Sequence, residues 1–323
     1  MNPALSSSSP ISTTVSAVSD SRVDTPIFLT GFARSGTTWV NRLLCDYFNA
    51  GFVNEGQFIV SFGLRLVRYG DLQRGDNHQR LVKDISEDPF FSILKKNYAI
   101  EIDWQHVAAV STTFAAIVLD VLRQIADQMG KVRIGSKYPV FGRHLDLLNR
   151  HFPDCRIVHV VRDGRDCALS HKHMRWGHQN TYAAAIHWRD YLLKAWKDAM
   201  SMPGRYLEIN YEDLLSKPES SIALLEEFIT GAPAGPVTER FMRDAQLLKL
   251  DKIARWRQTM TPRAQAMFEA VAGDALQQAG YPLTGIAHPP SILSRKLYVA
   301  HDRLSREAWH LARKVFPAIS EYK

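Results

Sequence analysis

Residues 26–44 read PIFLTGFARSGTTWVNRLL, and this stretch decides the fold. Its apolar start, residues 27–29, predicts a short buried strand, and apolar residues at helical spacing after Thr38 predict a helix. Between them stand Gly31 and Gly36, which are separated by four residues. A glycine loop between a strand and a helix presents backbone N–H groups and the positive end of the helix to a phosphate. The sequence therefore predicts a P-loop in an α/β protein of three layers, with a central, mainly parallel β-sheet flanked by helices.

The predicted loop lacks the lysine that follows the second glycine in ATP-binding P-loops. Thr37 and Thr38 stand there, and Arg34 is the only cation of the loop. The arginine offers a planar fork of donors, and the two hydroxyls can donate to an anion without a metal ion. This composition suits a 5′-phosphate that carries a second, weakly basic oxyanion. An ordinary glycine turn is the alternative interpretation.

A second motif follows at residues 156–170, RIVHVVRDGRDCALS. Its apolar residues 157–161 predict another buried strand, with Arg162 at its end. We expect Asp166 to cap the next helix and Ser170 to lie one turn into it. An arginine at a strand end and a hydroxyl on the following helix can converge on one phosphate. A surface ion pair between Arg162 and Asp166 is the simpler alternative.

Together the two motifs resemble the PAPS-dependent sulfotransferase family, where PAPS is 3′-phosphoadenosine 5′-phosphosulfate. The first is similar to its 5′-phosphosulfate loop, which implies cofactor contacts from Arg34, Ser35, Gly36, Thr37, Thr38 and Trp39. The second is similar to its 3′-phosphate motif, with Arg162 and Ser170 as ligands. Two weaker matches are Tyr211, near the family's adenine side, and KIARWRQTMT at 252–261, where Arg255 and Arg257 are stand-ins for a late basic loop.

The resemblance implies transfer of a sulfuryl group from PAPS to a hydroxyl or amine, with release of adenosine 3′,5′-bisphosphate. A base must take the acceptor's proton, and we expect Glu55 in this role, with His144 as the fallback. Lys137 would stabilise charge on the bridging oxygen or the acceptor, and Arg34 would bind the phosphosulfate. The sequence has no metal-binding motif, so we expect no metal to be required.

Two departures separate this chain from the steroid and phenol branch of the family. Gly164 stands where proline is usual, and the late loop lacks the Arg-Lys-Gly of that branch. The resemblance is therefore to a bacterial-type member outside the branch. We expect the partner to be an acceptor molecule (a carbohydrate, lipid, peptide or small hydroxylated compound) rather than nucleic acid.

Two other classes share part of the pattern. A P-loop small-molecule kinase using ATP would need a lysine where Thr37 stands and a magnesium-binding aspartate at a strand end. A non-catalytic nucleotide-binding protein would keep the phosphate loops and lose the base and the acceptor pocket. Glu55 and Lys137 favour the enzyme.

The remaining patterns indicate where the protein is located and how the chain is divided into domains. The 323 residues carry a formal net charge of +7, which suits anionic ligands but equally suits general solubility. The three cysteines form no close pair, and no signal peptide is evident, so we expect a cytoplasmic protein. Residues 1–24 are expected to be a disordered tail and residues 25–284 the sulfotransferase domain. The expected strands are 27–29, 53–55, 132–136, 157–161 and 206–210, and 107–122 is expected to form one buried helix.

Residues 285–323 are expected to form a basic amphipathic helix. Between 291 and 316 apolar residues recur at intervals of three and four, and arginine and lysine dominate the other faces. We expect the apolar stripe to pack against the body of the enzyme. The alternative is peripheral contact with anionic lipid, which basic amphipathic helices can make.

Overall fold

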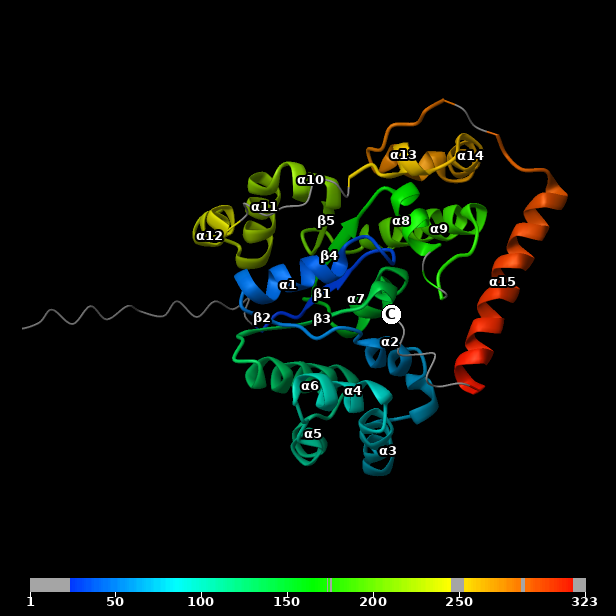
Figure 1. Cartoon of the computed structure of the whole chain (residues 1–323). Helices are drawn as coiled ribbons and strands as arrows, with labels where there is room; N and C mark the ends of the chain where they lie inside the picture. The colour runs from blue at the N-terminus through cyan, green and yellow to red at the C-terminus, as the bar shows by residue number, and fades with distance from the viewer. Residues whose placement is uncertain (1–23, 173, 175, 245–252, 286–287, 316–323) are drawn as a thin grey trace, which may run out of the picture.

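The computed structural model describes residues 24–172, 174, 176–244, 253–285 and 288–315 (Figure 1). Of the expected N-terminal tail, residues 1–23 lie outside this part of the chain. Lys252, the first residue of the late basic motif, lies outside it as well.

A parallel sheet of five strands lies at the centre of the fold, in the order β2-β3-β1-β4-β5. The strands are β1 (Ile27–Thr30), β2 (Ala50–Gly51), β3 (Arg133–Lys137), β4 (Arg156–Val161) and β5 (Tyr206–Asn210). In the register, Leu29 of β1 lies opposite Lys137 of β3 and Val158 of β4. The loops that leave β1, β3 and β4 therefore meet at one edge of the sheet. The expected parallel sheet is confirmed, and four of the expected strands agree within about one residue at either end.

The expected strand at 53–55 is wrong. The strand in this region is β2, and beyond it only Asn54 forms an isolated bridge with Lys137. The N–H groups of Glu55 and Gly56 both donate to the carbonyl of Lys137, at 2.9 and 3.4 Å, and Glu55 has a φ of 71°. The chain therefore bends at Glu55 instead of continuing the ladder, although Val53 is buried as in a strand.

Helices cover both faces of the sheet, which confirms the three layers (Figure 1). One face packs against α1 (Thr37–Tyr47), α10 (Tyr211–Ser216), α11 (Pro218–Thr230) and α12 (Pro236–Asp244). The other packs against α2 (Gln57–Gly63), α3 (Gly75–Ser86), α4 (Pro89–Tyr98), α5 (Trp104–Val110), α6 (Phe114–Gln128) and α7 (Leu145–His151), with the short 3-10 helices η1 (Leu66–Tyr69) and η2 (Pro139–Arg143). A third apolar cluster joins α8 (Gly164–His171), α9 (Thr181–Ala199), α13 (Trp256–Thr259) and α14 (Pro262–Gln278).

The expected single helix at 107–122 is instead the end of α5 and the start of α6. Ser111 follows the last residue of α5, and the side chain of Thr113 accepts a hydrogen bond from the N–H of Ala116 at the start of α6. Hydroxyl side chains offer the backbone an alternative to helical hydrogen bonds, and they are favoured at caps. The polar run Ser-Thr-Thr therefore separates two helices.

The expected C-terminal helix is present as α15 (Ile292–Val315), which runs along the edge of the molecule beside α9 (Figure 1). The expected packing of its leucines against the enzyme body is wrong, because Leu297 and Leu304 are exposed and the polar Asp302 is buried against the body. Like every other helix among the described residues, α15 is too short or too polar to cross a bilayer.

Candidate active site

Gly36 gives the glycine loop its shape. It precedes α1, whose first residue is Thr37, and has a φ of 90°. A Cβ atom at this position would lie 2.3 Å from the ring of Tyr211. Only glycine satisfies both the left-handed backbone and this close approach. The loop thus opens onto the N-terminus of an eleven-residue helix and places Tyr211 against its wall.

Arg34 joins the two sequence motifs. Its Nε donates to the Oγ of Ser170 at 2.9 Å, and its carbonyl accepts from the guanidinium of Arg162 at 3.2 Å. Arg34 itself has a φ of 75°, a conformation that arginine seldom adopts and that these contacts help to hold. The arginine of the glycine loop and the arginine and serine of the second motif therefore meet at one place.

A cavity of about 720 Å³ lies over this junction. Nine of the residues that the sequence predicted to bind cofactor line it, namely Arg34, Gly36, Thr37, Thr38, Trp39, Arg162, Ser170, Tyr211 and Arg255. The sequence reasoning missed five more, Arg42, Asp166, Leu169, Lys172 and Thr259. Arg42 stands one helical turn after Thr38, so a search for cations on the loop's helix would have found it. The cavity thus combines a helix N-terminus, several cations and hydroxyl donors.

Two predicted cofactor residues do not line this cavity. The side chain of Ser35 is buried with its Oγ 3.6 Å from the Sγ of Cys167, and its N–H donates to the carbonyl of Phe32. Arg257 stacks on the ring of Trp256 and lines a different cavity. Thr37 and Thr38, the first two residues of α1, line the cavity.

Asp166 does not cap α8, contrary to expectation. The cap is Asp163, whose carboxylate accepts from the N–H of Arg165 at 2.9 Å, because the helix begins at Gly164. Asp166 instead accepts from the N–H of Trp256 at 2.8 Å and lies 3.7 Å from Arg162. Its ion pair with Arg162 exists but is buried, and burial raises the pKa of the Asp166 carboxyl. Asp166 therefore connects the second motif to the late basic segment.

The φ of Gly164 is not in the left-handed region, so the backbone conformation does not require a glycine here. A Cβ atom at Gly164 would lie 2.5 Å from the ring of Trp188 and 2.6 Å from that of Phe268. The glycine is therefore required by packing. The same two rings leave no room for the proline that is usual at this position in the family.

Glu55 and Lys137 form an ion pair at the same edge of the sheet. The Nζ of Lys137 lies 3.0 Å from the Oε1 of Glu55; the lysine side chain is 4% exposed and the glutamate side chain 53%. Lys137 ends β3, next to the strand that leads into the glycine loop. Burial, and then the nearby carboxylate of Glu55, raises the pKa of Tyr138. A buried lysine thus holds a carboxylate that remains accessible.

A model of the sulfotransferase family matches residues 26–232, a span that contains the glycine loop, the second motif, Glu55 and Lys137. The chain belongs to the sulfotransferase family. The sulfotransferase domain of the curacin biosynthetic pathway has a similar fold, with a TM-score of 0.52 and 17% identity over 80% of this chain and 98% of that one. The sulfotransferase domain of the Synechococcus PCC 7002 olefin synthase has a TM-score of 0.51 and 19% identity over 80% of this chain and 95% of that one. No curated protein matches the sequence.

His144, the expected fallback base of this sulfotransferase, stands apart from the cavity. It precedes α7, and burial lowers its pKa; Asp146, Lys194, Arg143 and Asp198 are charged neighbours that act on it. Neither His144 nor Glu55 lines the cavity at the glycine loop. Glu55, however, pairs with Lys137 at the end of β3, beside the strand that leads into this loop, and is therefore the better placed of the two candidate bases.

His171 is a residue of this sulfotransferase that sequence reasoning missed. It ends α8, is 2% exposed, and its Nε2 donates to the carbonyl of Ala33 in the glycine loop at 3.1 Å. Its Nδ1 accepts from the N–H of His178 at 3.3 Å, so the neutral ring has both nitrogens paired. A proton on Nδ1 would point at the N–H of His178 and repel it, because both groups are donors. Burial, aided by His178, lowers the pKa of His171 to about 4.

Acid is expected to destabilise the fold through His171. Between its unfolded pKa of 6.5 and its folded value of about 4, only the unfolded chain takes up the proton, so stability falls as the pH decreases. The full loss is roughly 3 kcal/mol, reached below the folded pKa, and none of it applies above the unfolded pKa. Urea unfolding at a series of pH values measures this dependence.

The matched variant is His171→Gln, whose amide nitrogen corresponds in position to Nε2, so that it keeps a donor for the Ala33 carbonyl and cannot titrate. It should show a smaller loss of stability in acid than the wild type. His187, whose pKa burial also lowers to about 4, accounts for part of the remaining dependence. An unchanged pH dependence in His171→Gln would show that this ring is not the acid-sensitive group.

Proposed function

We propose that this sulfotransferase uses PAPS as its donor and transfers the sulfuryl group to a hydroxyl or amine of an acceptor. The observation that carries the proposal is the bond between Arg34 of the first motif and Ser170 of the second, with Arg162 bound to the carbonyl of Arg34. PAPS carries a 5′-phosphosulfate and a separate 3′-phosphate. A cavity lined by the N-terminus of α1 and by Arg162 and Ser170 suits a nucleotide that carries two separate anionic groups.

In the proposed complex, the N-terminus of α1 and the hydroxyls of Thr37 and Thr38 bind the 5′-phosphate. Arg34 binds the phosphosulfate, and Arg162 with Ser170 binds the 3′-phosphate. The rings of Trp39 and Tyr211 pack edge to face, with their centroids 6.4 Å apart, and would flank the adenine. Arg255 supplies a further cation at the wall of the cavity.

The proposed chemical step is an in-line displacement at sulfur. The carboxylate of Glu55 accepts the proton of the acceptor's hydroxyl or amine as its oxygen or nitrogen bonds to sulfur. The bond between sulfur and the bridging oxygen breaks, and the electron pair stays on the 5′-phosphate of adenosine 3′,5′-bisphosphate. Transfer of this kind depends on alignment and on neutralising the developing charge. Arg34 and Lys137 supply positive charge, so we propose that no metal takes part.

Lys137 has two functions in this mechanism. Its pairing with Glu55 at 3.0 Å fixes the position of the carboxylate, and its charge stabilises the bridging oxygen as the bond to sulfur breaks. The acceptor would approach Glu55 from solvent, since that side chain is half exposed. We propose an acceptor that is a carbohydrate, lipid, peptide or small hydroxylated molecule.

Calorimetric titration with adenosine 3′,5′-bisphosphate tests the donor site. We expect this ligand to bind much more tightly than 5′-AMP or ATP with magnesium, because only the bisphosphate engages both phosphate sites. Arg162→Ala should weaken its binding about a hundredfold, since it removes a charged, partly buried phosphate ligand.

Arg257→Ala is the matched control, because Arg257 lines a different cavity and should leave the affinity unchanged. Tighter binding of ATP with magnesium than of the bisphosphate would overturn the proposal and favour a kinase. Equal binding of the bisphosphate and 5′-AMP would show that no 3′-phosphate site exists.

A further inference from the structure

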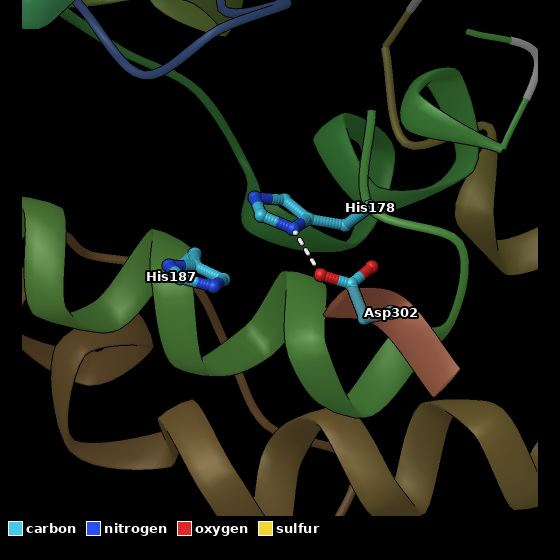
Figure 2. Close-up of side chains that lie close together, drawn as sticks. All are labelled: His178, His187 and Asp302. Carbon is cyan, nitrogen blue, oxygen red and sulfur yellow. Dashed lines mark hydrogen bonds and ion pairs between the residues drawn. The ribbon is translucent and has the colours of Figure 1, made fainter. Parts of the chain in front are cut away.

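Helix α15 is fastened to the enzyme by its polar face. The carboxylate of Asp302 is buried, accepts from the N–H of Gln179 at 2.7 Å and lies 3.2 Å from the Nδ1 of His178 (Figure 2). One turn earlier, the carbonyl of Tyr298 accepts from the side chain of Asn180 at 2.8 Å. Polar bonds to the segment before α9 therefore fix which side of α15 faces the body.

The cluster of His178, His187 and Asp302 in Figure 2 resembles a metal site in composition but not in geometry. The two imidazole rings are stacked, with centroids 4.2 Å apart and planes only 12° from parallel. A metal ion bound by a histidine lies close to the plane of its ring, and two stacked planes do not meet at one ion. Arg306 also lies 3.8 Å from the Asp302 carboxylate. The cluster serves to attach α15.

With its polar face turned inward, α15 presents its apolar stripe to solvent. The stripe comprises Leu293, Leu297, Leu304 and Leu311, whose exposed fractions range from 61% for Leu297 to 69% for Leu293. These positions follow one another at intervals of four or seven residues and therefore share one side of the helix. Four large side chains in a row on a solvent-facing helix form a continuous apolar surface that water does not favour.

Cations run along one edge of this stripe. Lys296 and Arg303 are seven residues apart and each directly precedes a leucine of the stripe, so both lie at its border. Within 292–315 the sequence has six arginines and lysines and two acidic residues, a formal charge of +4. Of the two acids, Asp302 is buried against the body and Glu307 pairs with Arg303.

We propose that α15 docks this enzyme on an anionic phospholipid surface. The leucine stripe would enter the boundary between headgroups and acyl chains, and Lys296 and Arg303 would bind the lipid phosphates. A second copy of the chain fits the stripe less well. Residues 292–315 of each copy carry a formal charge of +4, so two copies packed stripe to stripe would bring like charges together.

Co-sedimentation of the full chain with vesicles tests the proposal. We expect binding to phosphatidylcholine vesicles that contain phosphatidylglycerol, weak binding to phosphatidylcholine alone, and a decrease with added salt. The double variant Leu297→Ser and Leu304→Ser should lower the partition coefficient about a hundredfold. Lys296→Glu should lower it about tenfold.

Val67→Ser is the matched control, because Val67 is an exposed apolar residue on η1, 87% exposed and far from the stripe in sequence. It should bind vesicles as the wild type does, and thermal unfolding should show all variants folded, since the replaced side chains face solvent. Absence of vesicle binding by the wild type, or equal binding by the stripe variant, would overturn the proposal. A dimer that the stripe substitutions dissociate, without vesicle binding, would assign the stripe to self-association instead.

Discussion

Replacing Glu55 with glutamine is expected to lower kcat about a thousandfold and to leave the affinity for adenosine 3′,5′-bisphosphate unchanged. Glutamine keeps the shape of the side chain and an oxygen for Lys137, but it cannot accept the acceptor's proton. The phosphate cavity does not include Glu55, so nucleotide binding should survive. Single-turnover transfer from sulfate-labelled PAPS measures the first effect, and calorimetry measures the second.

His144→Gln is the control for this experiment. His144 was the other candidate base, and because we propose Glu55 as the base, His144→Gln should keep an activity close to that of the wild type. Full activity in Glu55→Gln would show that Glu55 is not the base. Loss of activity in His144→Gln together with that result would assign the role to His144.

The sheet was largely predictable because buried parallel strands leave a strong local signal. The strands β1, β4 and β5 are rich in apolar and β-branched residues. A glycine follows β1, an arginine follows β4, and a capping asparagine ends β5. The second strand was misplaced because Phe52 and Val53 are as apolar as strand residues. What ends the ladder there is the positive φ of Glu55, and no residue type at that position predicts it.

The cavity at the glycine loop was predictable where chain order fixes geometry. Gly36 and Arg162 each follow a strand of one parallel sheet, so the topology brings them to a common edge. The late segment carried no such constraint. There Arg255 lines the cavity, while Arg257 stacks on Trp256. Two arginines two residues apart point in different directions on a short helix, and the sequence does not indicate which one faces the site.

The direction of α15 was not predictable from its periodicity. An apolar stripe indicates which residues share a side of a helix, but it does not show which side meets the body. The buried contact of Asp302 with His178 decides this, and it joins residues 124 positions apart in sequence. His171, at the end of α8, is a second case, because its bond to the carbonyl of Ala33 also depends on tertiary packing. Long-range polar contacts of this kind leave no periodic pattern.

Arg34→Gln is expected to lower kcat/KM for PAPS by about a thousandfold or more. Glutamine is polar and similar in reach, so Ser170 and the loop keep a hydrogen-bonding neighbour, but the charge beside the phosphosulfate is lost. Because Arg34 would stabilise the leaving group as well as bind it, the loss should appear in kcat and not only in KM. Steady-state kinetics over a range of PAPS concentrations separates the two.

Arg34→Lys is the matched control, since it keeps the positive charge and meets the same backbone strain at a φ of 75°. Lysine lacks the planar fork that can reach Ser170 and the substrate together. We therefore expect kcat/KM for PAPS to decrease about tenfold, far less than in Arg34→Gln. If lysine and glutamine lowered kcat/KM equally, charge at this position would not drive the reaction. The function of Arg34 would then be to hold the glycine loop against the second motif through Ser170.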